Sequence, residues 1–146
     1  MYIFKEHIKI IKSSGFNFHN PYKFKDQFST IKKKKDILVT IYDAFESFYF
    51  EAWPYLKKNE IPFILFVSTQ PVGKNGYMTW DQIREIEKES FALIGHHSHS
   101  HGYLIDESYE EFISDIEKAN KIFLKELGYN PRLFSCLIYT SPSPRD

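Results

Sequence analysis

Four of the six histidines in this chain lie within six consecutive positions, from His96 to His101. A neutral imidazole is a common nitrogen ligand for divalent metals, whereas crowded imidazoles repel one another once they are protonated. A bound metal ion removes that repulsion because it keeps the rings neutral. The cluster therefore makes a metal site the first hypothesis. The alternative is a surface loop that happens to be rich in histidine and serine.

Two of these histidines, His97 and His101, are four positions apart. On a helix they would share one face, but the glycine and the short apolar run before them favour a loop or a first turn. Either arrangement brings both rings to one ion at roughly 2.0–2.1 Å, with a carboxylate as third ligand. Asp43 is the candidate carboxylate because it ends another apolar strand, and capping a helix is its alternative role. We expect His96 and His99 to be bystanders or outer-shell residues.

Apolar patterns along the chain predict strands that alternate with amphipathic helices. The expected strands are 37–42, 62–69, 91–94 and the start of a fourth at 132–134. The expected helices are 4–12, 47–59 (interrupted at Pro54), 79–90 and 108–127. Apolar strands separated by such helices indicate an α/β fold with a parallel sheet covered by helices. Asp43 and the histidines follow two of these strands, and sites in such folds gather at the carboxyl ends of strands.

Composition narrows the class of protein and its partners. The chain has 146 residues, of which 42% are hydrophobic, which suits one domain or part of a larger one. The formal net charge is zero, so nothing indicates nucleic acid as a partner. No segment reaches the roughly 20 apolar residues of a membrane span, and the N-terminus lacks the apolar core of a signal peptide. A single cysteine excludes an intramolecular disulfide framework.

The last eleven residues, 136–146, differ from the rest of the chain. They resemble the in-frame translation of a transposase adapter used to prepare sequencing libraries, and such segments are excluded from fold reasoning. The alternative is a Pro/Ser-rich natural terminus. We interpret residues 1–135 as part of one domain and 136–146 as a non-native tail, and we expect the natural gene to continue beyond Ser135.

Three segments together resemble a known family. Residues 39–45, 61–69 and 94–101 are similar to the polysaccharide deacetylase family, which is the NodB homology domain of carbohydrate esterase family 4. The resemblance covers most of residues 4–135. Its most specific element is a His-Ser-x-x-His pattern, preceded at the expected distance by the strand that bears the aspartate.

The resemblance implies a distorted (β/α) barrel, of which this chain is the N-terminal part. It also implies a metal-dependent hydrolase that removes N-acetyl, and sometimes O-acetyl, groups from a polysaccharide. By position, Asp43, His97 and His101 match the family's metal triad, which holds zinc or another divalent ion. Family members often work outside the cytoplasm, but no export signal is visible here, so the compartment is left open. The glycan and the oligomeric state are left open too.

Position 42 departs from the family pattern. The family has two consecutive acidic residues there, a general base and then a metal ligand, but this chain has Tyr42 before Asp43. A phenol has an unperturbed pKa of about 10 and is a poor base at neutral pH. We therefore expect impaired deacetylation with metal binding retained. Because aspartate and tyrosine codons differ by one base, a single-base difference from an active enzyme is the alternative to evolved loss of activity.

Truncation is the second departure from the family. The family's aromatic-Pro-Tyr-Gly segment would begin near Phe134, where the suspected adapter takes over, and the later strand with a catalytic acid histidine is absent. Two functions are alternatives to an active deacetylase. One is a catalytically inactive relative that binds metal or glycan, and the other is a different metallohydrolase on a similar barrel.

Overall fold

The structure, a computed structural model, describes residues 2–23 and 35–137. Its strands are β1 (Asn17–Phe18), β2 (Asp36–Ile37), β3 (Val39–Tyr42), β4 (Phe63–Val67) and β5 (Ala92–His96). Its helices are α1 (Tyr2–Ser13), the π-helix η2 (Phe48–Ala52), α3 (Trp53–Lys58), α4 (Trp80–Glu87) and α5 (Tyr109–Leu127). Two short 3₁₀ turns are η1 (Pro21–Lys23) and η3 (Leu104–Asp106).

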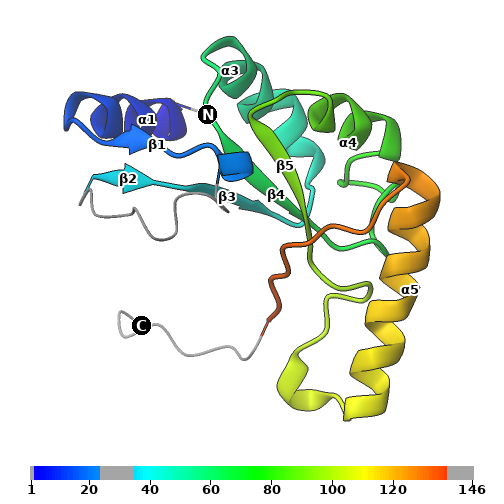
Figure 1. Ribbon diagram of the computed structural model, residues 1–146. Helices are drawn as coiled ribbons and strands as arrows, with labels where there is room; N and C mark the ends of the chain where they lie inside the picture. The colour runs from blue at the N-terminus through cyan, green and yellow to red at the C-terminus, as the bar shows by residue number, and fades with distance from the viewer. Residues whose placement is uncertain (1, 24–34, 138–146) are drawn as a thin grey trace.

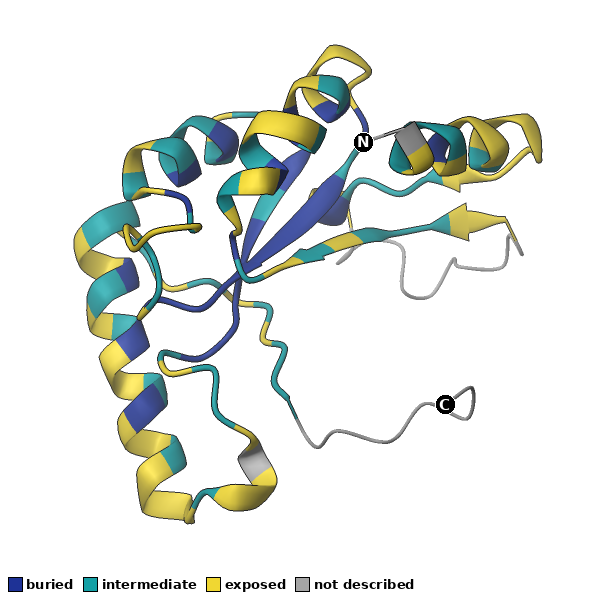
Figure 2. Ribbon diagram, turned by 180° about the vertical axis from the view of Figure 1, so that it is seen from behind, coloured by how far each residue is buried: buried dark blue, intermediate teal, exposed yellow. Residues whose placement is uncertain are grey.

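A parallel sheet in the order β3-β4-β5 lies at the centre of the molecule (Figure 1). Helices α3 and α4 lie along the sheet, α5 runs down one side, and the short parallel pair β1-β2 lies beside α1. Every residue of β4 is buried, as expected for a central strand covered on both faces (Figure 2). The predicted α/β class, with alternating helices and parallel strands, is therefore confirmed.

The strand predicted at 37–42 differs from expectation. It divides into β2 and β3, and β3 alternates between half-buried and exposed residues instead of being buried on both faces. Within the described residues β3 is an edge strand of its sheet, and Thr40 and Tyr42, on one of its two faces, are exposed. Tyr42 belongs to the exposed set, with 43% of its surface accessible.

The sequence predicted a strand that ends before Gly95, but the observed strand continues through this glycine. Strand β5 continues through it to His96, and Gly95 lies opposite Phe66 in the register of the sheet. A Cβ atom at this position would stand 2.4 Å from Cδ1 of the Phe66 ring. The glycine therefore makes room for an aromatic ring, and the strand ends at His96, two residues later than predicted.

Capping boxes begin two of the helices at the starts predicted for them. Thr79 and Gln82 form a capping box at α4, and Ser108 and Glu111 form another at α5. Pro54 lies in the first turn of α3, directly after the π-helix, so the predicted interruption of the 47–59 helix is confirmed.

The amphipathic helix predicted at 108–127 is present as α5, but its buried face is not wholly apolar. Phe123 is buried, whereas Tyr109, Ile113 and Leu124 are exposed. The buried positions of the helix are Asp115, Ala119 and Phe123, which are spaced four residues apart and so lie on one face. The sequence interpretation missed that the inward face of this helix includes a carboxylate.

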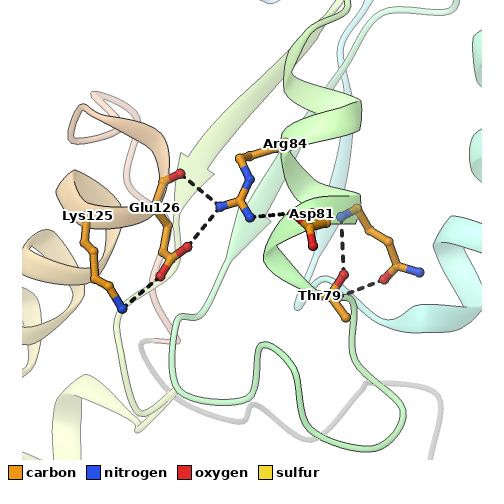
Figure 3. A network of polar contacts seen from close by, with 6 residues as sticks. Thr79, Asp81, Arg84, Lys125 and Glu126 are labelled. Carbon is orange, nitrogen blue, oxygen red and sulfur yellow. Dashed lines mark hydrogen bonds and ion pairs between the residues drawn. The ribbon is translucent and has the colours of Figure 1, made fainter.

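A salt-bridge network ties α5 to α4 (Figure 3). The guanidinium of Arg84 donates to the Glu126 carboxylate at 2.9 Å and to the Glu126 carbonyl at 3.2 Å. The same guanidinium donates to Asp81 at 2.6 Å. The ring of Trp80 also meets Phe123 edge-on, with centroids 5.8 Å apart. Polar and aromatic contacts together hold α5 against the rest of the fold.

The fourth predicted strand is reduced to a single parallel bridge between His96 and Phe134 in the part of the chain that the structure describes. Of the suspected tail, Cys136 and Leu137 are described, and 138–146 lie outside the described residues. The interpretation of 136–146 as non-native remains a prediction. No helix among the described residues has the length and apolar character to cross a membrane.

Candidate metal centre

Asp43 lies in a tight turn directly after β3. Its backbone N–H donates to the carbonyl of Phe66 at 3.0 Å, so the ladder between β3 and β4 continues one residue beyond the strand. Asp43 and Ala44 both have positive φ angles, 70° and 54°. The turn is pinned from outside because the N–H of Met78 donates to the carbonyl of Ala44. The carboxylate is thus fixed at the carboxyl end of the sheet.

The histidine loop after β5 is bonded along its length to the segment that follows β4. The N–H of His97 donates to the Val67 carbonyl at 3.0 Å, and the Ser68 hydroxyl donates back to the His97 carbonyl at 2.6 Å. The next two bonds run from the N–H groups of Thr69 and Gln70 to the loop carbonyls, at 3.2 and 3.0 Å. This backbone network extends the parallel pairing into the loop and positions it beside the Asp43 turn.

The spacing of four between His97 and His101 is realised by a turn and not by a helix. Ser98 and His101 have positive φ angles of 64° and 63°, which a helix does not allow. The Ser98 hydroxyl accepts a hydrogen bond from the His101 N–H at 3.1 Å, closing the turn. The loop alternative left open by the sequence is therefore the correct one.

The three predicted ligands converge. Nε2 of His101 lies 2.8 Å from Oδ1 of Asp43, and Nε2 of His97 lies 3.5 Å from the same oxygen. One ligand atom from each residue lies within 4.8 Å of the others. Oδ1 of Asp43 and Nε2 of His101 are buried and make no hydrogen bond. Two imidazole nitrogens and a carboxylate oxygen with free lone pairs suit a divalent ion such as zinc, so the residues fit the implied metal.

His97 is held in the orientation that such a site requires. The residue is 3% exposed, and its Nδ1 lies 2.7 Å from the carbonyl oxygen of Ser135. A carbonyl only accepts, so Nδ1 carries the proton and Nε2 keeps its lone pair toward Asp43. Burial lowers the pKa of His97 below its ordinary value despite the opposing hydrogen bond, which favours the neutral ring at neutral pH.

The other two histidines of the cluster point to different partners. His96 packs against the rings of Phe123 and Phe134, with centroids 5.1 and 5.3 Å away, and its Nδ1 accepts from the Ser98 N–H. Nδ1 of His99 lies 2.8 Å from the Thr69 hydroxyl. Neither belongs to the converging group in the described structure, which agrees with their predicted bystander role.

Tyr42 lies next to this group without entering it. Its ring stacks on Phe66, with centroids 5.3 Å apart and planes 14° apart, and its centroid is 5.3 Å from that of His97. The aromatic stack accounts for how a tyrosine is accommodated at the end of β3.

A cavity of about 210 Å³ adjoins two of the predicted ligands, Asp43 and His101. Phe45, Tyr77 and Lys74 also line it, and the two aromatic rings pair with centroids 5.1 Å apart. Sequence reasoning missed this wall because Tyr77 is far in sequence from the candidate ligands. The turn after β3 brings Phe45 opposite Tyr77, next to Asp43.

Comparison with known proteins identifies the family. The model of the family described as polysaccharide deacetylase matches residues 30–137. The chain belongs to the polysaccharide deacetylase family. This confirms the resemblance drawn from the sequence. Among curated proteins, no sequence matches the chain.

Solved structures agree on the fold. IcaB from Ammonifex degensii is 24% identical with a TM-score of 0.81, over 97% of this chain and 68% of IcaB. Streptococcus pyogenes deacetylase PplD, in complex with acetate, is 23% identical with a TM-score of 0.72, over 85% of this chain and 56% of PplD. A mutant of BA3943, a carbohydrate esterase family 4 pseudoenzyme with restored enzymatic activity, is 22% identical with a TM-score of 0.55. The match covers 67% of this chain and 35% of BA3943. This chain therefore spans 68% of the length of IcaB and 56% of the length of PplD.

The contact between His97 and Ser135 yields a test by NMR. In metal-free protein at neutral pH, long-range ¹H–¹⁵N correlations should show the His97 proton on Nδ1, because the Ser135 carbonyl accepts it. A proton found on Nε2 of His97 would contradict the geometry. Resonances of His99, assigned through a His99→Gln variant, serve as the internal comparison.

Proposed function

We propose that this chain is the metal-binding part of a polysaccharide deacetylase, a hydrolase that uses a divalent ion, zinc in the first instance, to remove acetyl groups from a polysaccharide. The observation that carries the proposal is the convergence of Asp43, His97 and His101 within 4.8 Å, in a chain whose family is defined by that activity. The acetate in the PplD structure supports the acetyl group as the part of the substrate that is processed.

Each residue has a distinct role in this proposal. Asp43, His97 and His101 would hold the ion, which when bound polarises an acyl carbonyl and lowers the pKa of a bound water. The Ser135 carbonyl holds His97 in the ligand tautomer. The adjoining cavity, about 210 Å³, is below the 300–1,000 Å³ or so of typical ligand pockets, so only part of a polysaccharide would enter it. The paired rings of Phe45 and Tyr77 form the wall that the sugar would meet.

Tyr42 limits the catalytic power of this chain. It occupies the family's general-base position, and a phenol is a poor proton acceptor at neutral pH. A second candidate function is therefore a catalytically inactive relative that binds metal or glycan. The BA3943 pseudoenzyme, a mutant of which has restored enzymatic activity, supports the idea that an inactive protein with this fold can regain activity by mutation.

Metal binding is the first prediction. The wild-type chain should bind one zinc ion, measured by competition with a chromophoric chelator, and Asp43→Asn and His101→Ala should weaken binding by more than the roughly 10–100-fold that changes to outer-shell partners cost. His99→Ala is the matched control, because the His99 side chain bonds Thr69 and not the converging group. Equal loss of affinity in the control would contradict the assignment.

Restoring the general base is the second prediction. In the full-length gene product, Tyr42→Asp should raise the rate of acetate release from an N-acetylated oligosaccharide by on the order of 10²–10⁴, with little change in zinc affinity. Tyr42→Phe is the control that removes only the hydroxyl and should match wild type. Turnover by the wild type equal to that of Tyr42→Asp would contradict the role of position 42. No turnover in either form would favour the binding candidate.

A further inference from the structure

The histidine loop adopts a backbone that needs support. Ser98 and His101 both lie in the left-handed region, with φ angles of 64° and 63°, although neither is a glycine. Such residues cost on the order of 1–3 kcal/mol each and persist where the surroundings hold them in place. His99 and Ser100 lie between these two residues, so contacts that hold the loop in this conformation would act on the backbone of His99 and Ser100.

Asp115 of α5 supplies contacts to both of these residues. Its Oδ2 accepts the N–H of His99 at 2.6 Å, and its Oδ1 accepts the N–H of Ser100 at 2.9 Å. The residue is 8% exposed, and within residues 2–23 and 35–137 no lysine or arginine forms an ion pair with it. Burial raises the pKa of Asp115, but the bonds from His99 and Ser100 outweigh it and hold the pKa below its ordinary value. The carboxylate is thus ionised and directed at the loop amides.

The helix that carries Asp115 is itself fixed in place. Ala119 and Phe123, one and two turns further along the same face, are fully buried. Arg84 binds the far end of the helix through Glu126 (Figure 3). A buried carboxylate without a cation is costly to desolvate, so its retention is explained best by the two charge-assisted bonds that it accepts.

We propose that Asp115 is a positioning residue for the metal centre: it holds the His99–Ser100 backbone so that His97 and His101 converge with Asp43. This inference rests on the proposed function, because it takes the two histidines to converge in order to bind a metal ion. Asp115 does not touch the ion. It acts through the two amides between the ligands and fixes a loop that would otherwise relax out of the left-handed conformation.

The test compares Asp115→Asn with two controls, one at the N-cap of α5 and one within the helix. Asparagine offers one acceptor oxygen, and its amide nitrogen meets the second loop N–H, so one bond is lost. Ser108→Ala removes the N-cap, which typically costs 0.5–2 kcal/mol, without touching the loop. Glu117→Gln removes one carboxylate charge at an exposed position. Zinc affinity is measured by chelator competition, and the free energy of unfolding is measured by urea titration in EDTA.

We expect zinc affinity to fall by about 10–100-fold in Asp115→Asn, the range for outer-shell partners, and to stay within about twofold of wild type in both controls. A merely structural role would lower unfolding free energy in Asp115→Asn and Ser108→Ala alike and leave the zinc affinity of the folded proteins unchanged. Wild-type affinity in Asp115→Asn would overturn the proposal, as would an equal loss in Ser108→Ala.

Amide hydrogen exchange keeps the proposal testable if the asparagine variant does not fold. In the metal-free wild type, the His99 and Ser100 amides should be protected, and rapid exchange at both would overturn the role of Asp115. Combined with the zinc-binding assay, hydrogen exchange separates the positioning role of Asp115 from the proposed function. A wild-type chain with protected amides that binds no zinc would contradict the proposed function while leaving Asp115 as the residue that holds the loop.

Discussion

The parallel pairing of β4 with β3 on one side and β5 on the other is the constraint on which the candidate site depends. The ladder does not stop at the strand ends, because the N–H of Asp43 bonds Phe66 and the N–H of His97 bonds Val67. Two residues more than fifty positions apart are thereby placed at the same edge of one sheet. Gly95 contributes by leaving room for the Phe66 ring, so that β5 packs in register.

Much of this arrangement was predictable from local patterns. The buried strand β4, both capping boxes and the restart at Pro54 follow from periodicity and from the chemistry of helix ends. The position of Asp43 and His101 at strand ends predicted their proximity. Strand β3 was predicted less well, because apolar composition does not distinguish an edge strand from a central one.

Other features depend on tertiary contacts that no local pattern contains. Asp115 was missed because an amphipathic pattern leads one to expect apolar residues on the buried face of α5, although its spacing of four from Ala119 was the signal that could have revealed it. The Ser135 carbonyl and the Tyr77 ring reach the site through chain segments far from it in sequence. The side chains of Asp43, His97 and His101 are thus held together by contacts from β4, α5 and the segment after α5, and Tyr42 lies beside them.

The most direct measurement is anomalous diffraction at the zinc edge from crystals grown with zinc. The account predicts one strong peak roughly 2.0–2.2 Å from Oδ1 of Asp43 and from Nε2 of His97 and His101. Crystals grown with zinc that show no peak among these three atoms, or a peak on His96 or His99 instead, would contradict it.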